Sequence, residues 1–227
     1  MHWSGTTATT LSDIEPKIQL LTNALLAGRA EEVRQSAFAA LAQGSTPNEI
    51  LDALVDAANI AADLCEVGEY DQERVAAVEN AVGSGLQVIE DRLAVAEGKF
   101  NLKATTGPIG LKAGNLVSMA VSASLRSVGF RSVNLGKSQT PLELLRNSEE
   151  LGADLVVPLL SGEEVETQLQ NFIEALERGG FKTKFEVIPV APGLPETVQA
   201  SVVIARNSSE AISRATEWAL RRQTRTK

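Results

Sequence analysis

The chain has 227 residues, of which 44% are hydrophobic, so it can bury one large core or two smaller ones. Its formal net charge of -8 argues against nucleic acid as a partner, because phosphate binding requires clustered lysine and arginine. The basic cluster Arg221, Arg222, Arg225 and Lys227 is interpreted as a helix end with a solvated tail. The apolar run 155–160 is much shorter than the roughly 20 residues of a membrane span. We therefore expect a cytoplasmic protein without a membrane partner.

The chain has one cysteine, Cys65, and one histidine, His2. Together these counts exclude an internal disulfide, most zinc sites, Ser-His-Asp triads and Cys-His dyads. Cys65 lies between apolar neighbours and is expected to be a small buried side chain. The sequence accordingly predicts neither a metal site nor a catalytic residue, and it favours a non-catalytic binding protein, with an enzyme of another kind as the alternative.

The first part of the chain has helical periodicity. Residues 1–11 lack any periodicity and are expected to form a disordered lead, whereas apolar residues from there to about residue 96 recur at helical spacing. One helix start is explicit, because Thr46 can cap, Pro47 suits the first helical position and Glu49 can complete a capping box. We predict a helical domain over residues 12–97, built as a four-helix bundle.

From residue 98 onward, strand-like runs alternate with helical patterns. The runs lie near Leu102 and Val133 and within residues 155–160, 185–190 and 202–205. This alternation predicts a five-stranded parallel sheet with helices on both faces over residues 98–222, followed by a basic tail, 223–227. Ligands of such sheets bind beyond the carboxyl ends of the strands, which makes loops the candidate sites, namely residues 105–114, 136–139, 159–162 and 191–196.

The first of these loops is rich in glycine and contains no histidine, cysteine or acid. Gly107, Gly110, Lys112 and Gly114 precede a helix that begins near Asn115, and backbone amides at a helix start can receive an anion. The spacing fits neither a P-loop nor the dinucleotide fingerprint. Two interpretations remain open, a tight strand-to-helix turn and a ligand loop.

Three stretches resemble the corrinoid (cobalamin)-binding subunits of methyl-transfer systems and the related B12-dependent photoreceptors. Residues 67–70, followed by a helix from residue 75, resemble the junction between that family's third and fourth helices. Residues 128–136 and 152–157 resemble its second and third strands. The resemblance implies a helical cap on a Rossmann-like (flavodoxin-like) B12-binding domain, with the corrin between the two.

The resemblance fails where the family coordinates cobalt. The family's first loop reads Gly-Asp-x-His-x-x-Gly-Lys-Asn, and its histidine binds cobalt from below. Matching Asn115 puts Pro108 at the acid and Gly110 at the histidine, whereas an ungapped match puts Lys112 and Gly114 there. Neither match supplies a ligand.

Two further departures lie along the slot that holds the displaced nucleotide tail of the family's cofactor. The family's serine after the third strand is replaced, although Ser161 lies nearby, and its Gly-Gly pair after the fourth strand survives only as Gly193. The larger residues at these positions would narrow the slot.

Two hypotheses follow. The first is a divergent corrinoid-binding protein without a histidine lower ligand, acting as a sensor, regulator or specialised carrier. Its candidate cofactor-binding residues are Gly107, Gly110, Lys112, Gly114, Asn115, Ser161, Gly193, Val67 and Tyr70, although a core position is the alternative for Tyr70. The second is a regulatory or interaction module that has lost the corrin or binds another flat or anionic small molecule. In either case a protein partner or a homodimer is a candidate assembly.

Overall fold

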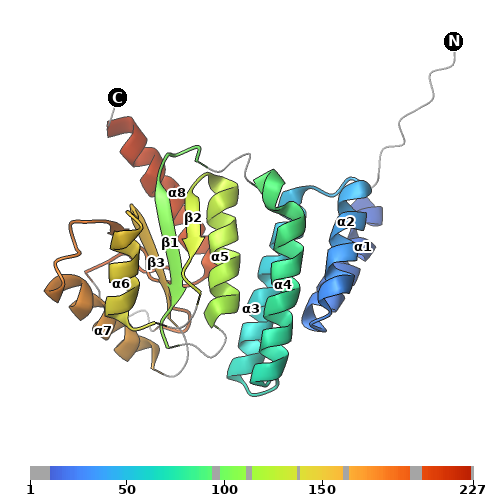
Figure 1. Cartoon of the computed structure of the whole chain (residues 1–227), viewed down its shortest axis with the longest axis horizontal. Coiled ribbons are helices and arrows are strands. Elements are labelled where there is room, and N and C mark those ends of the chain that lie inside the picture. Colours follow the sequence, from blue (N-terminus) through green and yellow to red (C-terminus); the bar gives the residue numbers. More distant parts are fainter. Residues whose placement is uncertain are drawn as a thin grey trace, which may run out of the picture.

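The computed structural model describes residues 11–93, 98–110, 114–136, 139–160, 164–194 and 201–225, and the lone histidine at position 2 lies outside them. Within these ranges, helices come first and an alternating α/β half follows (Figure 1). The first helices are α1 (Leu11–Leu26), α2 (Ala30–Ala42), α3 (Pro47–Glu66) and α4 (Gln72–Leu93). None of the described helices is both long and apolar enough to cross a membrane.

The start of α3 forms as its sequence predicts. The Glu49 amide donates to Thr46 Oγ1 at 3.2 Å, and the Thr46 amide donates to Glu49 Oε2 at 2.6 Å. This reciprocal capping box satisfies two amide donors that have no partner within the helix. It fixes the beginning of a helix that later forms one wall of the candidate site.

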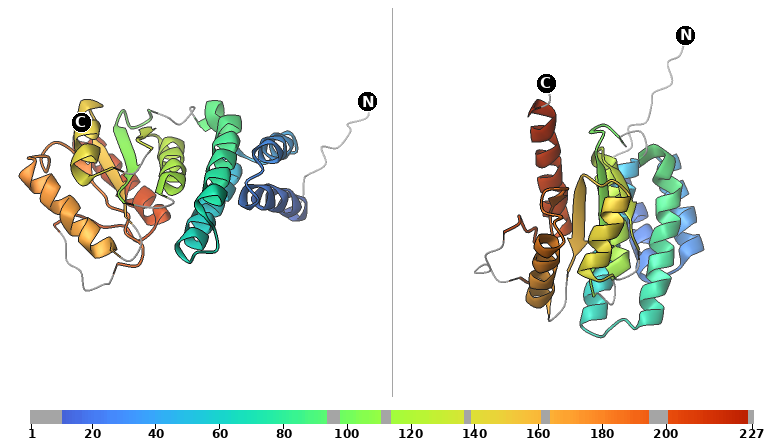
Figure 2. Two further views of the ribbon diagram at one scale, coloured as in Figure 1. Left: turned by 60° about the horizontal axis from the view of Figure 1, so that its bottom comes forward. Right: turned by 60° about the vertical axis from the view of Figure 1, so that its left-hand side comes forward.

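Helices α1 to α4 share one apolar core, which also includes part of the α/β half. Leu21, Leu54 and Ile89 are fully buried in it, together with Leu116 from the next helix, α5 (Gly114–Val128). Figure 2 shows α5 between the sheet and the pair α3 and α4, and α5 contacts both helices and the sheet. The two halves of the molecule are therefore packed together through α5.

The sheet is parallel and has the order β2-β1-β3-β4. Its strands are β1 (Lys103–Pro108), β2 (Arg131–Asn134), β3 (Leu155–Leu159) and β4 (Glu186–Val187). The remaining helices are α6 (Pro141–Glu150), α7 (Val165–Arg178) and α8 (Ser208–Arg225). Side chains of α5 and α8 pack on one face of the sheet, and those of α6 and α7 on the other. The expected parallel α/β arrangement with both faces covered is confirmed.

The prediction of five strands is wrong, because the described residues form a sheet of four. The run 202–205 contributes only an isolated bridge between Val190 and Ala205. Pro189 lacks an amide hydrogen, so this edge cannot form a regular ladder. The Ala205 amide instead donates to the Pro189 carbonyl at 2.8 Å, and the Ala191 amide donates to the Ala205 carbonyl at 2.9 Å.

The first strand is longer than the sequence suggested, because residues 105–108 of the expected glycine-rich loop belong to β1. Gly107 pairs with Pro158 and Pro108 with Leu159. A Cβ atom at Gly107 would lie 2.6 Å from Leu144 Cδ1, so glycine is required there by close packing against α6. At the other end of the chain, α8 reaches Arg225, so residues 223–225 of the expected tail are helical.

Candidate functional site

A cleft of about 470 Å³ lies between α3 and the carboxyl ends of β3 and β4. The carboxyl end of β1 and the turn between α3 and α4 lie at the same end of the molecule (Figure 1). Parallel sheets bind ligands at this end. The cleft is lined by Asn59, Ala62, Asp63, Glu66, Val117, Leu159, Leu160, Val165, Val190, Pro192, Gly193, Asn207 and Ser208.

The cleft has an apolar floor and a polar rim. Leu159, Leu160 and Val190 are buried at the strand ends, with exposed fractions of 1%, 1% and 3%. The rim carries the amide, carboxylate and hydroxyl groups of α3 and of the start of α8. A flat ligand with apolar faces and polar edges matches this division of chemistry.

The start of α8 presents a polar group to the cleft. Asn207 caps the helix, because its Oδ1 accepts a hydrogen bond from the Glu210 amide at 2.8 Å. Glu210 in turn accepts from the Arg206 amide at 2.7 Å, and this bond, together with one from Arg214, lowers the pKa of Glu210. The next residue, Ser208, is 8% exposed and lines the cleft.

A second groove, of about 730 Å³, continues from the cleft between α3, α5 and α8 and shares Asn59, Asn207 and Ser208 with it. Its α3 wall carries Asp52 and Asp56. Partial burial and the neighbouring Asp56 and Glu49 carboxylates raise the pKa of Asp52. The groove therefore has one acidic wall, which disfavours an anionic group on that side.

A chain of polar side chains connects α4 to β1 and β2 of the sheet. Asn115 donates a hydrogen bond to Glu79 of α4 and accepts one from Asn134 Nδ2 at 3.0 Å. Ser118 Oγ donates to Asn134 Oδ1 at 2.6 Å and lies 3.0 Å from Thr106 Oγ1, so the network reaches β1. Asn115 does not line the cleft, and its amide joins the helical half to the α/β half.

Gly110 follows the end of β1 and has a φ of +68°, which favours glycine. A Cβ atom at Gly110 would lie 3.3 Å from Nε2 of Gln168, on α7. The other amide atom, Gln168 Oε1, is buried and has no hydrogen-bond partner among the residues that the structure describes. Gly110 therefore has no room for a larger side chain unless Gln168 moves.

Aliphatic side chains fill the space beneath the cleft floor on the α6 and α7 side of the sheet. Ile109, Leu160, Val165, Ala191 and Leu194 belong to one buried cluster there, with exposed fractions of at most 7%. Within the described part of the chain there is no group of three or more histidine, cysteine, aspartate or glutamate side chains that could hold a metal ion. The cleft therefore offers a ligand an apolar floor and polar groups along its rim.

Comparison with solved structures shows which proteins have a similar fold. The monomethylamine corrinoid protein of Methanosarcina barkeri superposes with a TM-score of 0.68 at 17% sequence identity, over 90% of this chain and 99% of that chain. The chain has the fold of a corrinoid protein.

Two further solved structures match with lower TM-scores. The methanol:cobalamin methyltransferase complex of Methanosarcina barkeri matches at 0.45, with 16% identity over 95% of this chain and 86% of that chain. A cobalamin-binding protein from Desulfitobacterium hafniense DCB-2 matches at 0.46, with 12% identity over 91% and 98% of the two chains. No protein-family model matches the chain, and no curated protein sequence matches it either.

Within this corrinoid-protein fold, the expected site residues are dispersed. Gly193 lines the cleft. Gly107 is buried within β1, Gly110 lies beside Gln168, and Gly114 is the first residue of α5. Lys112 and Ser161 lie outside the described residues.

The two candidates from the helical half do not line the cleft. Val67 is 73% exposed and directly follows Glu66, which does line it. Tyr70 packs against the helical core, and its hydroxyl donates to the Leu26 carbonyl at 3.0 Å. Cys65 is 5% exposed, as expected of a small buried side chain.

The cleft residues that the sequence did not single out come from separate elements. Asn59 and Asp63 lie on the α3 face that borders the cleft, and Val117 comes from α5. No pattern in the sequence indicated that α3 would lie opposite the start of α8 at Ser208. Only the packing of α3 against α5 brings these residues together.

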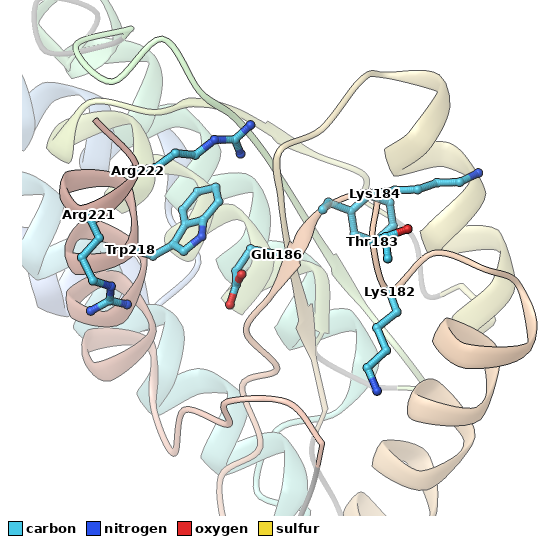
Figure 3. Close-up of a pocket in the computed structure, with 8 residues that line it drawn as sticks. Lys182, Thr183, Lys184, Glu186, Trp218, Arg221 and Arg222 are labelled. Carbon is cyan, nitrogen blue, oxygen red and sulfur yellow. The ribbon is translucent and has the colours of Figure 1, made fainter. Parts of the chain in front are cut away.

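The basic end of α8 lies beside a separate cavity of about 410 Å³ at the amino end of β4 (Figure 3). Lys182 and Lys184 point away from Trp218 in this view. The cations of the cavity are paired with carboxylates: Lys182 with Glu177, Lys184 with Glu149, Arg221 with Glu217 and Arg222 with Asp154. Glu186 adds a further carboxylate to the lining, so this cavity is a poor phosphate site.

Proposed function

We propose that the chain is a corrinoid-binding protein that holds the macrocycle over the apolar floor of the cleft and supplies no histidine to its cobalt. The observation that carries the proposal is the position of this cleft, between α3 and the strand ends, in a corrinoid-protein fold. The corrin faces are apolar and its edges carry amides, so the buried floor and the rim of Asn59, Asn207 and Ser208 fit it chemically.

The space beneath the floor fits the rest of the cofactor poorly. Ile109, Leu160 and Leu194 fill the side on which a displaced nucleotide tail would need a slot. We therefore propose that a bound cobalamin keeps its own base on cobalt or is five-coordinate. The cofactor supplies the cobalt chemistry when bound, and the residues of the chain bind and orient the macrocycle.

The absence of a protein ligand bears on the biological role. The axial ligand tunes the electronic properties of a metal cofactor, so a carrier without one is poorly suited to routine methyl transfer. A sensor, a regulator or a specialised carrier is the role we propose. Another protein of the same system or a second copy of the chain is the partner such a role would require.

A second candidate is a regulatory or interaction module that uses the same scaffold without a corrin. The same aliphatic filling favours it, because a closed slot beneath the floor is also what a protein without the cofactor would contain. Under this proposal the cleft binds a different flat small molecule. Its acidic α3 wall argues for a neutral or cationic ligand there.

Incubation with cobalamin separates the two candidates. The purified full chain is mixed with methyl-, hydroxo- or adenosylcobalamin and passed through a gel-filtration column, and the visible spectrum of the protein peak is recorded. The first candidate requires corrin to co-elute in at least one form with a spectrum that lacks histidine ligation. Protein free of corrin in all three experiments would leave the second candidate.

A further inference from the structure

The amino ends of the strands lie at the negative pole of the α/β half. A helix that connects two parallel strands runs opposite to them, so its carboxyl end lies beside their amino ends and carries a partial negative charge. Figure 1 shows the carboxyl end of α8 there. Lys103 Nζ donates to the Leu151 carbonyl, just beyond α6, at 2.7 Å. This end of the sheet therefore suits cations.

The cavity of about 410 Å³ at this end has one carboxylate in its lining, that of Glu186. The lining also carries two lysines and two arginines, but each of these is paired with another carboxylate, and none of the pairs uses Glu186. Figure 3 shows Glu186 and Trp218 between the start of β4 and α8, with the lysine side chains directed away. A group that enters the cavity thus meets a carboxylate beside an indole ring.

The indole ring of Trp218 already attracts one cation. The guanidinium carbon of Arg222 lies 5.4 Å from the ring centroid, and Asp154 holds the same guanidinium at 3.1 Å. Phe185 adds a second, largely buried ring to the lining. Aliphatic stems of long cationic side chains pack on such apolar surfaces while their charged heads remain with polar partners.

We propose that this cavity binds an organic cation, an ammonium group on an aliphatic stem. The ammonium pairs with Glu186, and the stem lies against Trp218. A cavity of this volume accommodates a small molecule or a single side chain, so a free amine and the lysine side chain of another protein are two sources of the same group. The cavity lies at the opposite end of the strands from the cleft, so the proposal does not depend on a corrin.

The fluorescence of Trp218 reports binding directly in a Trp3→Phe background, because the chain has two tryptophans. The full chain, without cobalamin, is titrated with n-butylammonium, with the blocked peptide acetyl-Gly-Lys-Gly-amide and with neutral butyramide. The two cations should change the fluorescence to saturation, and butyramide at the same concentrations should not. Tighter binding of the peptide identifies a protein's lysine as the source of the group, and tighter binding of butylammonium identifies a free amine.

Glu186→Gln keeps the shape of the side chain and removes its charge, so the dissociation constant of butylammonium should rise about tenfold. Glu73→Gln is the matched control, because it changes the net charge equally at an exposed position on α4, and it should bind as the parent does. Coincident urea transitions of the parent and both variants verify that the fold is intact. Equal responses to butylammonium and butyramide, an unchanged affinity of Glu186→Gln, or no response to either cation overturns the proposal.

Discussion

At the scale of single residues, Gly110 is the position whose backbone and neighbour restrict the side chain most clearly. The position that one sequence match assigns to histidine has a φ of +68° and lies against Gln168. A histidine there would need a left-handed backbone and would collide with the amide unless Gln168 moved. The backbone conformation and the neighbouring amide at position 110 thus suit glycine.

A pair of glycine substitutions tests this account of Gly110. Gly110→Ala should lower the free energy of unfolding by about 1–2 kcal/mol, because alanine at positive φ is strained. Gly83→Ala in α4 should raise it by about 0.5–1 kcal/mol, because the new Cβ would lie 3.5 Å from Met119 Cε in ordinary contact. Urea unfolding of both variants measures the two values. Equal effects of the two substitutions would contradict the assigned strain.

At the scale of elements, helix caps could be predicted from the sequence. The pairing between strands could not. The capping box of α3 forms at the expected threonine, Thr46, because four consecutive residues contain the whole signal. Gly107 and Pro108 instead suggested a loop. They form strand because β3 supplies partners for them, and those partners are about 50 residues away along the chain.

The cap of α3 is open to a direct test. Thr46→Ala should lower the free energy of unfolding by about 1 kcal/mol, because the Glu49 amide loses its acceptor. Thr46→Ser keeps the hydroxyl and should retain most of the stability. Chemical denaturation of both variants measures the free energy of unfolding. A serine variant as unstable as the alanine variant would show that the hydroxyl does not stabilise the start of α3.

At the scale of the whole molecule, the site depends on how the two halves pack. Asn59, Val117, Val190 and Ser208 come from four segments spread over about 150 residues, and no local pattern links them. The general location beyond the strand ends followed from the alternating strands and helices. The identity of the α3 residues did not, because their positions depend on the core that α5 shares with α3 and α4.

This shared core predicts that the two halves unfold together. Leu116→Ala should lower the free energy of unfolding by about 2–5 kcal/mol, because Leu116 is fully buried where the halves meet. In a Trp3→Phe background, the fluorescence of Trp218 reports on the α/β half, whereas the far-ultraviolet circular dichroism reports on all helices. The two urea transitions should coincide in the wild type and shift together in the variant. Separate transitions would show that the halves are independent.

The central claim, that a corrin lies in the cleft between α3 and the strand ends, can be tested by blocking that cleft. Ala62→Phe places a ring from α3 into it, whereas Ala76→Phe places the same ring on the exposed face of α4. Each full-length variant is mixed with hydroxocobalamin and gel-filtered, and the corrin absorbance of the protein peak is compared with that of the wild type. We predict co-elution with the wild type and Ala76→Phe, and at least a tenfold loss for Ala62→Phe. Equal corrin in all three peaks, or corrin in none, would contradict the claim.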